Sequence, residues 1–264
     1  MVESSSMTGM SAAASSSLTS SAAPELRNAG GKSPAEVREM FGRVARRYDF
    51  LNHLLSLGLD FTWRRRLARE LEGLESGAWL ADICTGTGDV AFAAKRRVPG
   101  LRVLALDFTP EMVAYGPRKA ARKGVGGIVF GIGDALRLPL SDASAAASSV
   151  SFGIRNVGDL ERGLRELARV VRPGGKVLVL EFTKPRGRIF GPLYMSYLKY
   201  VLPLVAKLIA FAAGDAYRYL PSSIQAFAGP EEMKQRMEAI GLKDVQAVPL
   251  TFGTVHLYVG NKAS

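Results

Sequence analysis

From residue 78 onward, the chain alternates short apolar segments with segments of helical spacing. The first four run over residues 78–83, 89–97, 101–106 and 110–123. This order predicts parallel strands joined by crossover helices that pack on the sheet. Further strands are expected at 127–131, around 148–152 and at 176–182, with a helix over 160–171. The predicted fold class is therefore α/β.

The carboxyl-terminal part follows a different pattern. A helix expected over 230–240 stops at Gly241, and two extended segments, 243–250 and 254–259, are joined tightly through Phe252-Gly253. This spacing predicts an antiparallel hairpin. The two-halved dinucleotide-binding fold ends on parallel strands, so the hairpin discriminates between related α/β folds.

The first 32 residues are mostly Ser, Ala, Gly and Thr, with hardly a large apolar side chain. We therefore expect them to form a disordered tail. An organelle transit peptide is the alternative, but the near absence of arginine before Arg27 argues against it and favours a cytoplasmic location. Order is expected to begin at Ser33, where Ser33-Pro34-Ala35-Glu36 forms a capping box for a helix running to about residue 47. Helices within 33–75 are predicted to form a lid on a single domain over 33–264.

Charge and composition limit the partners. The 264 residues are 47% apolar, which is enough to bury a full core, and 35 basic against 24 acidic side chains give a net charge of +11. Such a charge suits a nucleic-acid backbone or an anionic membrane surface. Aromatic residues are not interleaved with the basic runs, which argues against nucleic acid. One cysteine, Cys84, allows no intrachain disulfide, and with two distant histidines it predicts no metal site.

A glycine-rich loop that starts at Asp82 lies where the first strand ends and a helix begins. Gly86 and Gly88 permit a sharp turn and bring a ligand close to backbone amides, and Gly86-x-Gly88-x-x-Ala91 matches the alanine form of the dinucleotide fingerprint. Asp107 closes the next strand 107 − 88 = 19 residues later, where a carboxylate can accept hydrogen bonds from ribose hydroxyls. Together these features predict an adenosine-containing ligand.

The charges beside the loop separate two candidate cofactors. Asp82 and Asp89 flank the glycines and would repel the pyrophosphate of NAD. They suit the sulfonium and α-ammonium groups of S-adenosylmethionine, which we therefore favour. An NAD-dependent reductase remains the alternative on the loop alone. Asp134 and Ala135, after the third strand, are expected to hold the adenine.

Several longer blocks resemble the menaquinone and ubiquinone biosynthesis C-methyltransferases. They are Phe41-x-x-Val44-Ala45-x-x-Tyr48-Asp49-x-Leu51-Asn52, Asp82 through Asp89, Ser151-Phe152-Gly153-Ile154-Arg155-Asn156-Val157, Arg172-Pro173-Gly174-Gly175, Tyr217-x-Tyr219-Leu220 and Leu250-Thr251-Phe252-Gly253. The glycine loop and Pro-Gly-Gly blocks are common to class I methyltransferases, whereas the blocks at 48–52 and 151–157 are more specific. The resemblance covers the chain from about residue 33 to the end.

The resemblance implies a class I S-adenosylmethionine-dependent methyltransferase with a seven-stranded Rossmann-like sheet. It implies methyl transfer to the ring carbon of a lipophilic quinol, demethylmenaquinol, with a ubiquinol-pathway or phylloquinol-pathway acceptor as the alternative. By matching position, the implied cofactor contacts are Thr87, Asp107, Asp134, Ala135 and Ser151, beside Asp82, Gly86 and Gly88 of the loop. The oligomeric state is left open.

Five residues are candidates for catalysis. A quinol ring carbon becomes nucleophilic when the adjacent phenol loses its proton, so the site needs stabilisation of negative charge and a proton acceptor. Arg155 and Asn156 follow the fourth strand; Arg155 is expected to stabilise a phenolate and Asn156 to hold the hydroxyl or a water, with a structural clamp as the alternative. Tyr48, Asp49 and His53 are further candidates, and His53 can act as the base or pack within the lid.

The most apolar segment spans residues 189–213. Two lysines near its middle oppose insertion across a bilayer, so an interfacial or lid helix within a substrate lid at 186–228 is predicted, with an ordinary core helix pair as the alternative. The side chains expected to suit a polyprenyl tail are Tyr194, Tyr197, Leu198, Val201 and Leu202. The basic surface is expected to allow peripheral contact with anionic headgroups.

The fourth strand departs from the family pattern. Residues 144–149 are only serine and alanine, which are poor strand formers with little area to bury. We therefore expect this strand to be weakly packed.

Overall fold

The computed structural model describes residues 26–45, 47–185, 190–201, 204 and 214–264. Residues 1–25, which make up most of the predicted tail, lie outside the described part. Residues 26–32, also expected to be disordered, pack on the domain. Asn28 is buried and its Nδ2 donates a hydrogen bond to the carbonyl oxygen of Asn156. The described order thus begins ahead of Ser33.

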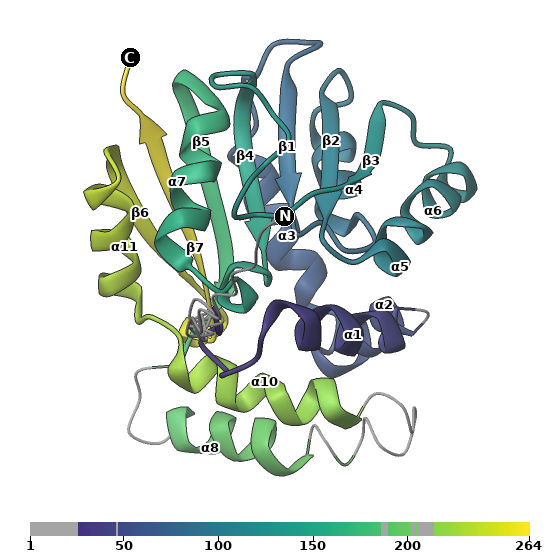
Figure 1. Ribbon diagram of the computed structural model, residues 1–264, viewed down its shortest axis with the longest axis vertical. Helices are drawn as coiled ribbons and strands as arrows, with labels where there is room; N and C mark the ends of the chain where they lie inside the picture. Colours follow the sequence, from purple (N-terminus) through teal and green to yellow (C-terminus); the bar gives the residue numbers. More distant parts are fainter. Residues whose placement is uncertain (1–25, 46, 186–189, 202–203, 205–213) are drawn as a thin grey trace, which may run out of the picture.

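Seven strands form one mixed sheet (Figure 1). They are β1 (Trp79–Ile83), β2 (Arg102–Asp107), β3 (Ile128–Ile132), β4 (Ala145–Ser151), β5 (Val171–Phe182), β6 (Leu242–Leu250) and β7 (Val255–Lys262). Their order is β3-β2-β1-β4-β5-β7-β6, and β1 to β5 are parallel. Strand β7 runs antiparallel to both β5 and β6. The predicted terminal hairpin and α/β class are therefore confirmed.

Helices cover both faces of the sheet. On one face lie α3 (Leu59–Arg69) and α4 (Asp89–Arg97), whose apolar side chains join a buried cluster with β1 and β2. On the other lie α7 (Leu160–Val170) and α11 (Pro230–Ala239), which are in front of the sheet in Figure 1. Asp159 caps α7, since its Oδ1 accepts the Arg162 backbone N–H at 3.0 Å, as the sequence predicts.

The helix expected over 110–123 is divided in two. Helix α5 (Pro110–Val113) is followed by α6 (Tyr115–Lys123). Pro117 explains the break, because it has no N–H to donate to the carbonyl of Val113 four residues earlier.

Strand β4 is fully buried between β1 and β5, contrary to the expected weak packing. Ser148 Oγ donates to the Leu167 carbonyl at 3.0 Å, and Ser149 Oγ donates to Asp82 Oδ1 at 2.7 Å. Because both buried hydroxyls have partners, the serines carry no unpaired polar group into the core. Small side chains here let helix α7 approach the sheet.

A second layer of helices lies across the carboxyl ends of the parallel strands (Figure 1). It comprises α1 (Pro34–Val44), α2 (Tyr48–Leu55), α8 (Phe190–Ser196), the π-helical turn η2 (Tyr197–Val201) and α10 (Gly214–Ala226). Val44, Leu51, Leu198 and Ile224 form its buried centre, so segments about 150 residues apart in sequence pack together. The predicted capping box of α1 is present, with Ser33 and Glu36 each bonding the other's backbone N–H.

The described helices are all too short or too polar to cross a membrane. Part of the apolar segment at 189–213, including Leu202, lies outside the described residues.

Candidate active site

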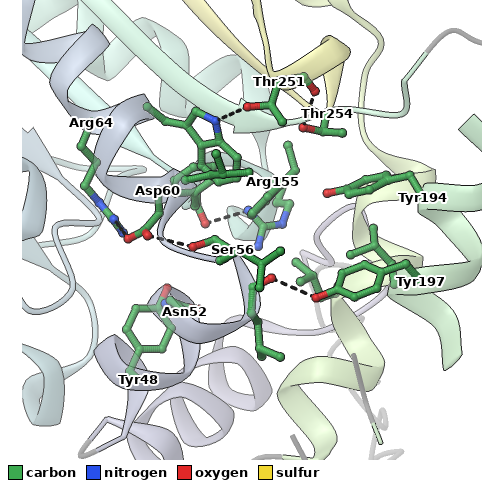
Figure 2. A pocket seen from close by; sticks show the side chains of 18 of the residues that line it. Tyr48, Asn52, Ser56, Asp60, Arg64, Arg155, Tyr194, Tyr197, Thr251 and Thr254 are labelled. Atoms are coloured by element: carbon green, nitrogen blue, oxygen red, sulfur yellow. Dashed lines mark hydrogen bonds and ion pairs between the residues drawn. The ribbon is translucent and has the colours of Figure 1, made fainter. Parts of the chain in front are cut away.

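A mainly apolar cavity of about 370 Å³ lies between the helical layer and the ends of β4 and β5 (Figure 2). Its apolar lining consists of Phe41, Val44, Leu55, Leu57, Leu59, Trp63, Phe152, Phe182, Leu198, Leu220 and Phe252. Of the five residues expected to suit a polyprenyl tail, Tyr194, Tyr197 and Leu198 line this cavity, whereas Val201 is exposed. The cavity therefore joins the predicted amino-terminal lid to the predicted substrate lid.

A second cavity of about 120 Å³ lies at the carboxyl ends of β1, β2 and β4, and a small one of about 30 Å³ continues it along the glycine loop. The second cavity includes Gly86, Asp107, Asp134, Ala135, Ser151 and Asn156 in its lining. The small one includes Asp82, Gly86, Thr87, Asp89 and Ser151. Tyr48 and Phe152 line all three cavities, so the apolar cavity and the loop cavities meet at these two side chains.

Asp107 is fixed at the end of β2 by backbone donors. Gly86 N–H donates to its Oδ2 and Thr109 N–H to its Oδ1, each at 2.8 Å. Burial nevertheless raises the pKa of Asp107, against these hydrogen bonds. The carboxylate lies in the lining of the second cavity, where its oxygens can accept hydrogen bonds from neighbouring hydroxyls.

Asp82 is buried at the end of β1, and burial raises its pKa to about 6. The hydroxyls of Thr85 and Ser149 donate to its two oxygens at 2.5 and 2.7 Å and oppose that shift. At neutral pH the site thus holds a poorly hydrated negative charge, and a cation beside it would relieve that cost.

The two glycines of the loop have different roles. Gly86 lines the cavities with φ of 58°, in the left-handed region that glycine tolerates. Gly88 has φ of 92° and lies outside the lining of these cavities; a Cβ there would stand 2.8 Å from the ring of Phe130. Gly88 thus allows the loop to pack closely against Phe130 of β3.

Ser151 brings a hydroxyl group to the loop cavities. Its Oγ is buried without a hydrogen-bond partner and lines both loop cavities. Buried hydroxyls are rarely left unpaired, so a polar ligand atom is expected here. Asp82, Asp107 and Ser151 offer acceptor oxygens, and Arg64, which also lines the small cavity, is paired with Asp60 and Asp89, so the site fits a cationic adenosine cofactor.

Thr87 and Asp49 belong to a cluster of ionic contacts beside the glycine loop. Thr87 Oγ1 donates to Asp49 Oδ1 at 2.5 Å, and Lys119 Nζ lies 2.6 Å from Asp49 and 2.5 Å from Asp89. Asp49 therefore ties α2 to the loop and lies outside the lining of the three cavities. Asp49, a candidate for catalysis from the sequence, is engaged by Thr87 and Lys119 in the structure.

Arg155 and Asn156 line different cavities. Arg155 lines the apolar cavity, and its Nη1 forms a 2.5 Å ion pair with the buried Glu181 and donates to the Phe152 carbonyl at 2.8 Å. Burial raises the pKa of Glu181, although Arg155 opposes the shift. Asn156 lines the second cavity and accepts a 3.0 Å hydrogen bond from the Tyr219 hydroxyl.

His53 also lies behind the cavity wall rather than in it. Its Nδ1 is 2.6 Å from Asp60 Oδ2, and its ring stacks on Phe61 with centroids 4.3 Å apart. His53, Asp60 and Asp89 offer ligand atoms within 4.8 Å of one another. Arg64 supplies the positive charge at this point, because its guanidinium pairs with both carboxylates.

Asp60, Arg64 and Trp63 line the apolar cavity and were missed by the sequence interpretation. Trp63 Nε1 donates to Thr251 Oγ1 at 2.8 Å and joins α3 to the turn between β6 and β7 (Figure 2). The four-residue spacing of Asp60 and Arg64 was a signal for an ion pair on one helix face. It gave no indication that the pair faces a cavity.

Solved structures with this fold identify the class. The structure is similar to a putative S-adenosyl-L-methionine-dependent methyltransferase of Methanococcus maripaludis, with a TM-score of 0.59, 15% identity and coverage of 85% of this chain and 94% of the other. It is also similar to a SAM-dependent methyltransferase of Aquifex aeolicus, with a TM-score of 0.52, 18% identity and coverage of 75% and 87%. With the antiparallel β7, the fold is that of a class I S-adenosylmethionine-dependent methyltransferase.

The chain belongs to the ubiE/COQ5 methyltransferase family, whose model matches residues 29–262. It is 43% identical over 226 residues to the demethylmenaquinone methyltransferase of Deinococcus radiodurans (86% of this chain, 92% of the relative) and 44% over 223 residues to that of Thermus thermophilus (84% and 100%). The ubiquinone/menaquinone biosynthesis C-methyltransferase UbiE of Geobacter sulfurreducens is 40% identical over 228 residues (86% and 88%). The chain is a methyltransferase, and the NAD-dependent reductase is set aside.

Proposed function

We propose that the protein methylates the ring carbon of demethylmenaquinol with S-adenosylmethionine, giving menaquinol. The observation that carries this is the meeting of an apolar cavity and the acidic loop cavities at Tyr48 and Phe152. The names of the Deinococcus and Thermus relatives support the choice of acceptor. Ubiquinol-pathway and phylloquinol-pathway acceptors are the alternatives with the same chemistry.

The loop cavities are proposed to hold S-adenosylmethionine, which supplies a methyl group on a sulfonium. Asp107 would accept hydrogen bonds from the ribose hydroxyls, and Asp134 with Ala135 would hold the adenine. Asp82 would face the cationic methionine end, and Ser151 Oγ would gain the partner that it lacks. Gly86 contributes a backbone surface that a side chain would obstruct.

The apolar cavity is proposed to hold the quinol ring and the start of its tail. Arg155 would place a fixed positive charge near the phenol oxygen, which favours the phenolate and raises the nucleophilicity of the ring carbon. Tyr48 lies where the cavities meet and would orient the ring toward the methyl donor. Asn156, held by Tyr219, would act from the cofactor side.

Peripheral contact with an anionic membrane surface, from a cytoplasmic location, is part of the same proposal. Leu57 and Phe252 line the apolar cavity yet are 81% and 84% exposed, and Leu193 and Tyr200 are also exposed on the helical layer above it. Apolar side chains at the mouth of a cavity for a lipid-like substrate suit interfacial insertion. The net charge of +11 adds electrostatic attraction.

The test is a calorimetric titration with S-adenosylmethionine, followed by methyl transfer to short-chain demethylmenaquinol, a demethylated ubiquinol precursor and a phylloquinol precursor under reducing conditions. We expect binding, and transfer at the highest kcat/KM to demethylmenaquinol. Preference for another acceptor would change the pathway and keep the chemistry. Absence of cofactor binding by the folded protein would refute the proposal.

A further inference from the structure

Asp60 is the single carboxylate in the lining of the apolar cavity among the residues that the structure describes (Figure 2). The other polar side chains of this lining are hydroxyls, one amide and the two guanidinium groups of Arg64 and Arg155. Apolar side chains make up the rest, and Asp60 itself is only 2% exposed. A buried charge in such a cavity is costly unless it has partners or a purpose.

The partners of Asp60 leave one acceptor position open. Oδ2 is 2.6 Å from His53 Nδ1 and also accepts from Arg64 Nη1, while Oδ1 accepts from Ser56 Oγ at 2.8 Å. A carboxylate offers about four acceptor positions, so the three donors leave one, on Oδ1. Ser56 Oγ also lies 3.2 Å from the His53 carbonyl, which gives its proton a second acceptor.

Asp60 is ionised at neutral pH. Burial would raise its pKa, but the charge of Arg64 and the hydrogen bonds from Ser56 and His53 outweigh burial and hold the pKa below its ordinary value. An ionised carboxylate accepts hydrogen bonds and donates none. The cavity wall at Asp60 therefore attracts a hydroxyl and disfavours a carbonyl oxygen.

We propose that Asp60 Oδ1 accepts a hydrogen bond from a ring hydroxyl of the acceptor and thereby selects the reduced quinol over the oxidised quinone. This inference rests on the proposed function. A quinol presents O–H donors, whereas a quinone presents two carbonyl oxygens that would face the carboxylate without a proton between them. Selection matters because only the quinol has a phenol whose ionisation activates the ring carbon.

His53 and Arg64 are positioning residues in this arrangement. Because the carboxylate only accepts, the short contact requires His53 to carry its proton on Nδ1 and to hold Oδ2. Arg64 reaches from Asp60 to Asp89, with Nη2 3.7 Å from Asp89 Oδ2, and so links the cavity wall to the cofactor loop. Because His53 and Arg64 both contact Oδ2, the open acceptor position for the substrate is on Oδ1.

The experiment measures equilibrium binding of a short-chain demethylmenaquinol and of its quinone under anaerobic conditions, with the protein saturated by S-adenosylhomocysteine. A hydrogen bond to a charged group predicts quinol binding about 10- to 100-fold tighter than quinone in the wild type. Asp60→Asn should bring that ratio close to one, because an amide both donates and accepts. Thr62→Ala is the control: it removes an exposed hydroxyl of α3 that lies outside the cavity lining, keeps the carboxylate and its donors, and should preserve the ratio.

A ratio that is the same in Asp60→Asn and wild type would overturn the inference and leave Asp60 as the ion-pair partner of Arg64. If Asp60→Asn does not fold, the inference is tested with the wild-type protein and the 1,4-dimethyl ether of the quinol, which has no O–H. The ether should bind about 10- to 100-fold more weakly than the quinol. Equal binding of the ether would refute the role of Asp60. If the protein transfers the methyl group but binds quinol and quinone equally, this inference alone is wrong. If neither compound binds, the proposed function is wrong as well.

Discussion

At the scale of single residues, Asp82 makes stability depend on pH. The pKa of Asp82 in the folded protein is about 6, above the ordinary value of 3.8. The protonated carboxyl therefore stabilises the folded state in full below about pH 4, and this contribution to the free energy of unfolding is lost as the pH rises through 6. Two pKa units correspond to about 3 kcal/mol. We expect Asp82→Asn to gain up to about this much stability relative to wild type between about pH 4 and pH 7, measured by urea unfolding. A difference between the two proteins that does not change with pH would contradict the shift.

Arg155 lines the apolar cavity and also stabilises the fold through Glu181. Arg155→Ala would leave Glu181 buried and unpaired, at a cost of about 3 to 5 kcal/mol. The loss of activity in that variant would therefore mix catalysis with unfolding. We expect the double variant Arg155→Met with Glu181→Leu to recover most of the free energy of unfolding but not methyl transfer. Recovered transfer would mean that the charge of Arg155 is dispensable for catalysis.

At the scale of elements, α7 depends on its first turn. Asp159 satisfies the Arg162 N–H, and the helix carries Leu164 and Leu167 into the core. We expect Asp159→Ala to lower the free energy of unfolding by about 1 kcal/mol, and Asp159→Asn, an equally good cap, to lower it far less. Thermal or urea unfolding of the three proteins measures this, and an equal loss in both variants would assign the effect to charge rather than capping.

Element positions and the residues of the loop cavities were predictable where local chemistry determines them, whereas the lining of the apolar cavity was predictable only in part. The helix expected at 89–97 begins and ends as predicted, because the glycine loop precedes it and its spacing is regular. Asp49 was predicted to serve catalysis, but Lys119, 70 residues away in sequence, pairs with it. The role of Asp60 likewise depends on helices that meet only in three dimensions. Sequence periodicity carries no information on which polar side chain faces a cavity.

At the scale of the whole molecule, the exposed apolar rim and the basic charge predict vesicle binding. Burial of a Leu or Phe side chain contributes about 1.5 to 3 kcal/mol. Leu57→Ser and Phe252→Ser should each weaken binding to vesicles that contain an anionic phospholipid by at least about tenfold, measured by sedimentation. Val129→Thr, which changes an exposed apolar residue on edge strand β3, is the control and should bind as wild type. Equal binding by all four proteins would remove the rim from the proposal.

Tyr48 and Phe152 form a wall that three cavities share. A ligand that orders these side chains from one side prepares the surface that the other ligand meets, so the conformational entropy is lost only once. Thermodynamic linkage then requires reciprocity: the factor by which cofactor tightens quinol binding equals the factor by which quinol tightens cofactor binding. With cofactor and quinol in the proposed places, we expect the two to be coupled through the wall between them, so that the ternary complex is favoured over either binary one.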